Sequence, residues 1–143
     1  MASDKYTANY RVQVTGTALK QGQKLPVTDK VRAWIIQEML LLKYWPQIAD
    51  RFDHEPAFGA IEFKFGSRDH WIRVFAYQDD ERKTMWIIKV MVKKSNELRV
   101  ADKVSITTAI SRIKQDIEHF KKQQEEQKKN LKFLKGGQQD ESR

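Results

Sequence analysis

Hydrophobic and polar residues alternate in four short stretches of the chain, and this period of two is typical of β-strands with one buried face. The stretches are residues 8–16, 60–66, 70–77 and 84–94. Only the polar run QDDERK, residues 78–83, separates the last two. Consecutive strands with such a short polar connection are usually antiparallel neighbours, so we expect a hairpin there.

Two longer stretches place hydrophobic residues three and four positions apart, as an amphipathic helix does. The first, residues 29–44, follows Thr28, a residue type that often caps a helix. The second covers residues 103–122, with its apolar side at Ile106, Ala109, Ile110, Ile113, Ile117 and Phe120. Glycine and proline predict a loop at residues 16–26, and DHEPAFG, residues 53–59, also reads as a loop. Residues 47–52, which follow Pro46, predict one short further helix.

The order strand, helix, three strands, helix predicts an α+β fold. We expect a small, mostly antiparallel sheet of about four strands, with helices packed on one face and the other face partly open. One domain should cover residues 1–122. Residues 123–143 are highly polar, and we expect a frayed end of the last helix followed by a disordered tail.

The alternation also predicts which side chains share a face of the sheet. Glu62 and Lys64 should point away from Ile61, Phe63 and Phe65, and Arg73 should lie on the same side as Tyr77. In the last strand we expect Trp86, Ile88, Val90 and Val92 on the packed side. Met85, Ile87, Lys89, Met91 and Lys93 should then lie on the other side.

Composition and charge narrow the classes of function. The net charge is +8 and the isoelectric point is about 9.7, which favours a polyanionic partner, although solubility alone also explains a basic surface. The chain has no cysteine, which excludes disulfides and thiol catalysis. The N-terminus has no apolar signal segment, and no apolar run approaches the length of a membrane span. We therefore expect a cytoplasmic protein with no membrane contact.

Familiar catalytic motifs are absent from the sequence. His54, His70 and His119 do not form a pair at metal-ligand spacing, and we expect no metal site and no cofactor. No phosphate-binding glycine loop and no nucleophile elbow is present. The acidic residues at 79–81 lie beside Arg82 and Lys83 and indicate a solvated hairpin tip.

A basic and aromatic set on the three central strands remains as the candidate site. Lys64, Arg73 and Lys89 should all point away from the most apolar face, and Lys93 and Lys94 follow at the end of the last strand. Tyr77 shares a face with Arg73, and Arg68 lies in the preceding turn. Such cations can stabilise the charge that develops when a 2′-hydroxyl attacks the neighbouring phosphate of RNA, and a tyrosine can stack or donate a proton. A lysine among other cations can act as acid or base.

Two other interpretations of this set stay open. Cations on the open face of a sheet are ordinary solvated residues, and lysine on an edge strand prevents aggregation. Cations beside aromatic residues also bind nucleic acid without cleaving it.

The strands and the last helix resemble the phage-derived, HigB-like branch of the RelE toxin superfamily. The matching segments are Glu62 to Lys64, Ile72 to Tyr77, Met91 to Lys94, and Ile106 to Ala109, where the family has Glu-Leu-Arg, an aromatic-Arg strand, Phe-apolar-Lys-Lys and Ile-x-x-Ala. The amphipathic helix from Asp29 is similar to the helical segment that precedes the family's sheet. The resemblance covers about residues 27–120.

This resemblance implies a metal-independent mRNA endonuclease that acts on the ribosome, the toxin of a toxin–antitoxin pair. Its partner would be a small helix-turn-helix antitoxin that covers the basic face. Arg73 would stabilise phosphate, Lys64 would stand at the family's arginine position, and Lys93 and Lys94 at its lysine pair. Tyr77 joins the catalytic set, and Lys89 and Arg68 join Lys94 as RNA-binding residues, on strand geometry alone.

The sequence leaves two alternatives to a catalytic toxin. One is a non-catalytic nucleic-acid-binding module on the same fold, such as a domesticated phage protein. The other is a protein-interaction domain whose C-terminal tail recruits a partner. Cleavage specificity, oligomeric state and the antitoxin's identity do not follow from the residues.

Overall fold

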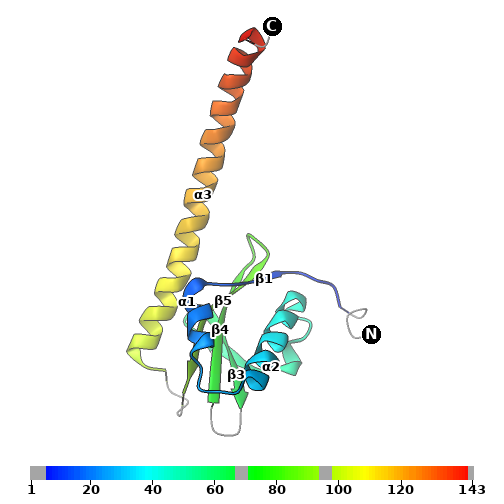
Figure 1. Cartoon of the computed structure of the whole chain (residues 1–143), viewed down its shortest axis with the longest axis vertical. Coiled ribbons are helices and arrows are strands. Elements are labelled where there is room, and N and C mark those ends of the chain that lie inside the picture. The colour runs from blue at the N-terminus through cyan, green and yellow to red at the C-terminus, as the bar shows by residue number, and fades with distance from the viewer. Residues whose placement is uncertain (1–5, 67–70, 94–97, 142–143) are drawn as a thin grey trace. The chain divides into compact units, whose positions relative to one another are not determined.

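The computed structural model describes residues 6–66, 71–93 and 98–141 of the chain (Figure 1). Within the last helix, the side chains of residues 117, 119, 120 and 132–141 are outside the description. The chain divides into two compact units, Met1–Ile110 and Ser111–Arg143. The sheet, the short helices and the start of the last helix belong to the first unit.

The first unit is built on a five-stranded sheet in the order β1-β5-β4-β3-β2. Its strands are β1 (Arg11–Val14), β2 (Asp53–Ala57), β3 (Ala60–Gly66), β4 (Trp71–Asp79) and β5 (Thr84–Val92). β1 pairs with β5 in parallel, and all other neighbours are antiparallel. This confirms the α+β class and the mostly antiparallel sheet, with five strands where about four were expected.

The helices of the first unit are α1 (Gly16–Gln23) and α2 (Asp29–Leu40), with the 3-10 helices η2 (Leu41–Tyr44) and η3 (Ala49–Arg51) after α2. The Thr28 side chain caps α2 by accepting a hydrogen bond from the Val31 amide at 3.2 Å, as expected. One face of the sheet and these helices form the main core, which includes Ile35, Met39, Leu42, Phe63, Phe65, Ile72, Val74 and Ile87.

Helix α1 replaces the loop predicted for residues 16–26. The Thr15 side chain accepts from the Ala18 amide at 3.2 Å and caps the helix, and Ala18 is buried in the core. Gly16 and Gly22 stand near the two ends of α1, where glycine weakens a helix least. Gln21 of α1 also accepts a hydrogen bond from the Val90 amide at 2.9 Å, beyond the point where β1 ends.

Strand β2 replaces the loop predicted for residues 53–59. It pairs with β3 through a two-residue turn, in which Phe58 has a φ of 54° and Gly59 a φ of 90°. Two positive φ values fit a hairpin turn well, but phenylalanine is a rare residue there, so the sequence carried little signal. The strand lies at the edge of the sheet, where Pro56 is tolerated.

A β-bulge in β5 changes which of its side chains face the core, so the predicted faces of this strand are partly wrong. The register shifts opposite Phe75 and Ala76, so that Ala76 faces Ile87 and Phe75 faces Lys89. Ile88 is the extra residue between them. Val90 and Val92 pack against the core as expected, but Met85 and Ile87 join them there. Trp86 lies opposite Tyr77, on the other face.

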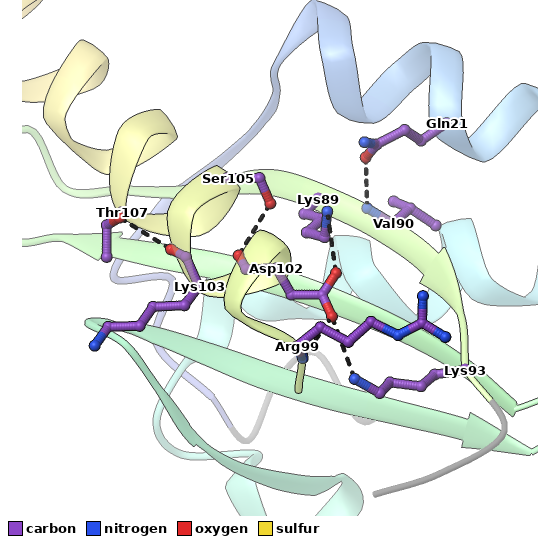
Figure 2. A network of polar contacts seen from close by, with 9 residues as sticks. All are labelled: Gln21, Lys89, Val90, Lys93, Arg99, Asp102, Lys103, Ser105 and Thr107. Carbon is purple, nitrogen blue, oxygen red and sulfur yellow. Dashed lines mark hydrogen bonds and ion pairs between the residues drawn. The ribbon is translucent and has the colours of Figure 1, made fainter. Parts of the chain in front are cut away.

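Helix α3 (Val100–Glu141) begins in the first unit. Its first turns lie against the sheet face that carries Lys89 (Figure 2), with Asp102 and Ile106 buried. The expectation that this face is partly open is therefore wrong at its centre. α3 continues to Glu141, past residue 122, and the division into a domain at 1–122 and a tail at 123–143 stays a prediction. None of the helices in the described part of the chain has the length and apolar character that a membrane crossing requires.

Candidate nucleic-acid interface and an apolar groove

Two rows of side chains cross the sheet on the face away from the main core. Cross-strand partners align Glu55, Glu62, Phe75 and Lys89 in one row. They align Asp53, Lys64, Arg73 and Met91 in the next row. Because partners across a sheet share a face, the predicted set of Lys64, Arg73 and Lys89 is brought together as expected.

Carboxylates of the first row neutralise cations of the second row. Arg73 and Glu62 form an ion pair in which the residues are only 2% and 1% exposed. Lys64 pairs with Glu55 of β2, with 3.1 Å between Nζ and Oε1. The Arg73 pair is thus enclosed by the fold, while the Lys64 pair reaches the edge of the sheet.

Asp102 of α3 holds the other two lysines (Figure 2). Its two carboxylate oxygens lie 3.8 Å from Lys89 Nζ and 3.2 Å from Lys93 Nζ. The Arg99 amide also donates to Asp102 at 2.9 Å. Lys93 and Asp102 are both buried, so two ammonium groups with little access to water share one carboxylate. This leaves an excess of positive charge that a phosphate group can match.

The charged network lowers the pKa of two carboxyl groups. Burial alone would raise the pKa of Asp102, but the Arg99 amide and the charges of Lys93 and Lys89 outweigh burial and lower it. The hydrogen bond and charge of Lys64 lower the pKa of Glu55. Both groups are therefore held in their ionised form.

Stability is expected to fall in acid for this reason. A carboxyl whose pKa is lower in the folded state stabilises the fold above its unfolded pKa, and this contribution is lost as the pH falls through the folded pKa. The ordinary value for Asp102 is 3.8, so its contribution is lost below that pH. Urea unfolding at about pH 5 and about pH 2.5 measures the loss. Asp102→Asn should lose less stability over this range, and an equal loss would contradict the role of Asp102.

Tyr77 lies on the same face as Arg73, as predicted, but at the other end of β4. Four residues along a strand span about 13 Å. Burial, together with the charges of Asp79 and Asp80, raises the pKa of Tyr77. Its hydroxyl therefore stays protonated near neutral pH, where it can donate a hydrogen bond but cannot act as a base.

Two residues of the predicted set, Arg68 and Lys94, lie outside the described residues. In the part of the chain that the structure describes, no group of three His, Asp or Glu side chains could hold a metal ion. Glu55 and Asp102 were not predicted as counter-ions. The alternation already placed Glu62 beside Lys64, but nothing in the sequence tied an acidic residue of α3 to β5.

An apolar groove on the first unit was also missed, because α1 was expected to be a loop. It lies between α1, α2 and the strands β1 and β5, and holds a cavity of about 160 Å³. Leu19, Ile36 and Leu40 line it and are each 54% exposed. Large apolar side chains gathered at the surface of a groove commonly mark a binding site.

Comparisons with known proteins give structural likenesses only. No protein-family model matches the chain, and no curated protein matches it. The chain is similar to the RelBE2 toxin–antitoxin complex of Mycobacterium tuberculosis, with 22% identity and a TM-score of 0.48 over 62% of this chain and 97% of that one. It is also similar to a free E. coli RelE toxin with two arginines mutated to alanine, with 18% identity and a TM-score of 0.47 over 73% of this chain and 98% of that one. For the intact E. coli RelBE complex, the identity is 19% and the TM-score is 0.45, over 60% of this chain and 99% of that one. At such identities and scores, these likenesses say nothing of this chain's chemistry.

Proposed function

We propose that this protein is the toxin of a toxin–antitoxin pair and cleaves mRNA on the ribosome without a metal. The observation that carries the proposal is the set of four cations, Lys64, Arg73, Lys89 and Lys93, on one face of three adjacent strands and at the end of β5. Three carboxylates pair with them, and because Lys89 and Lys93 share Asp102, these two lysines keep a net positive charge. The exposed Asp53 also stands in the row of Lys64. The assignment to the phage-derived, HigB-like branch belongs to the same proposal.

The residues divide by their access to RNA. Lys64 lies nearest the sheet edge and can exchange its carboxylate for a phosphate. Lys89 and Lys93 lie under Asp102 and would meet a phosphate only after Asp102 moves away. Arg73 is enclosed with Glu62 and would act on the phosphate through its charge, or after the pair rearranges. Tyr77 would donate a hydrogen bond or stack on a base at the far end of β4. Lys94 and Arg68 complete the proposed RNA-binding set.

Induced expression in a bacterial host tests this proposal. We expect growth arrest, and cleavage of mRNA bound to purified ribosomes. Lys64→Gln should reduce cleavage at least about tenfold, the scale of one lost transition-state contact. Lys24→Gln makes the same charge change on an exposed residue next to α1 and should leave cleavage unchanged.

Two outcomes would overturn the catalytic part. If expression is harmless and ribosome-bound mRNA stays intact, the protein is not such a toxin. If RNA binds with a steep salt dependence but stays intact, the protein is a non-catalytic binding module on this fold.

The antitoxin partner is part of the proposal, and the apolar groove supports it. An apolar helix face in the groove would cover Leu19, Ile36 and Leu40. The exposed Lys20 and Lys30 of α1 and α2 favour an acidic partner. A helix-turn-helix antitoxin with such a segment is the expected binding partner, and this contact lies apart from the basic face that the antitoxin was expected to cover.

A single substitution in the groove tests this contact. Ile36→Glu places a charge on an already exposed position, so we expect normal folding and a loss of antitoxin binding of about 100-fold or more. Co-purification of the two chains and titration calorimetry measure it, with Gln37→Glu on the exposed neighbouring residue as the matched control. Equal binding by both variants would place the antitoxin elsewhere.

A further inference from the structure

The second unit, Ser111–Arg143, consists of the distal part of α3 and carries a heptad pattern. Along the sequence, spacings of four and three alternate through Ile113, Ile117, Phe120, Gln124, Gln127, Leu131 and Leu134. These are the a and d positions of a coiled coil, which lie on one side of a helix and face a partner helix. The polar glutamines in the middle weaken such a seam but fix its register.

The two described apolar residues of this seam differ in burial. Ile113 is only 8% exposed. Leu131 is 58% exposed on the same side of the helix, eighteen residues later. The distal part of the seam therefore lacks a cover at Leu131, and a separate helix can provide one.

The charges beside the seam indicate which kind of partner helix would bind there. Lysine recurs every seven residues at Lys114, Lys121, Lys128 and Lys135, the e position of each heptad. The g positions hold Asp116, Gln123, Asn130 and Gly137. In a parallel pair, each g residue of one helix lies near the e residue of the other in the next heptad. A second copy of this chain would offer these lysines one acidic residue, Asp116, whereas an antiparallel copy would set lysine against lysine.

We propose that the distal part of α3 binds an acidic amphipathic helix of another protein as a coiled coil. The partner helix would carry apolar residues at its a and d positions and glutamate or aspartate beside them. This surface goes beyond the proposed RNA site and does not depend on it.

Two designed peptides test the proposal with the full-length protein. Both have isoleucine and leucine in their seams, and one has glutamate at all e and g positions while the other has lysine. We expect the glutamate peptide to bind at about 0.15 M salt, and the lysine peptide to bind at least about tenfold more weakly, because several ion pairs become repulsions. Fluorescence anisotropy measures both affinities.

Adjacent lysines supply a matched control within the chain. Lys128 occupies an e position, while Lys129 occupies an f position on the outer side of the helix. Lys128→Glu should weaken the glutamate peptide about three- to fivefold, and Lys129→Glu should change its affinity much less. Leu131→Ser should weaken both peptides, and circular dichroism should show unchanged helix content in all three variants.

Three results would overturn the proposal. One is failure of the glutamate peptide to bind the protein. Another is an equal loss of affinity for the glutamate peptide in Lys128→Glu and Lys129→Glu, which would mean that only the net charge of the helix matters. The third is self-association of the protein that Leu131→Ser abolishes, measured by sedimentation, which would make a second copy the occupant of the seam.

Discussion

Replacing Arg73 with alanine is expected to lower the free energy of unfolding by about 3–5 kcal/mol, the cost of leaving one partner of a buried ion pair without its counter-charge. Glu62 is only 1% exposed and would remain as a buried carboxylate without its counter-charge. Urea unfolding of the purified protein near neutral pH measures the change.

A double variant separates the lost charge pair from the lost volume. Glu62→Leu combined with Arg73→Met replaces both charges with apolar groups and should recover most of the stability, since paired apolar substitutes are often neutral. If Arg73→Ala alone unfolds at the same urea concentration as the unmodified protein, the ion pair contributes nothing to the free energy of unfolding.

This result bears directly on any test of catalysis at Arg73. A variant that relieves growth arrest only because it no longer folds says nothing about phosphate chemistry. Lys64→Gln is the better probe, because it breaks a pair at the sheet edge and leaves Arg73 and Glu62 in place. Arg73→Ala becomes informative only at a temperature where it is still folded.

Replacing Asp102 with asparagine is expected to have two opposite effects. The free energy of unfolding should fall by about 1–3 kcal/mol, since two partly buried ammonium groups lose their charged acceptor. Affinity for RNA should rise about tenfold, which corresponds to removing a repulsion of about 1.4 kcal/mol between the carboxylate and a bound phosphate. Urea unfolding and fluorescence anisotropy with a short RNA measure the two effects.

Asp50→Asn is the matched control for this variant. It removes the same charge from an exposed residue of η3, on the helical side of the sheet. Added inorganic phosphate should also raise the thermal midpoint of Asp102→Asn more than that of the unmodified protein, because an anion that binds the folded state stabilises it. If Asp50→Asn raises RNA affinity equally, the change in net charge explains the higher affinity. The Asp102 carboxylate then does not compete with RNA phosphate for Lys89 and Lys93.

Where the sequence follows a regular pattern, the predicted structure agrees with the observed one. The strand at residues 60–66 matches β3, and Thr28 caps α2 as its residue type indicates. The faces of Lys64, Arg73 and Tyr77 follow from a period of two, because the bulge adds its extra residue to β5 and leaves the alternation of β3 and β4 intact. In each case one local rule decides the structure, and the tertiary fold agrees with it.

Elements that depend on a partner far along the chain did not follow from the sequence. β2 exists because β3 is there to pair with, and its turn at Phe58 uses a residue that rarely adopts a positive φ. Ile88 becomes a bulge only in the register with β4. Asp102 reaches Lys89 and Lys93 only because α3 folds back over the sheet, and spacing along the chain cannot reveal such a contact.

The contact between Gln21 and Val90 has a consequence for the protein at high concentration. Beyond Val14, the edge of β5 would offer amide groups to any passing strand, which is how sheets join edge to edge and aggregate. Gln21 takes up the Val90 amide, and at the opposite edge Pro56 of β2 has no amide hydrogen to donate. Neither edge is a simple template for strand addition, so we expect the protein to stay free of sheet-mediated aggregates when it is overproduced.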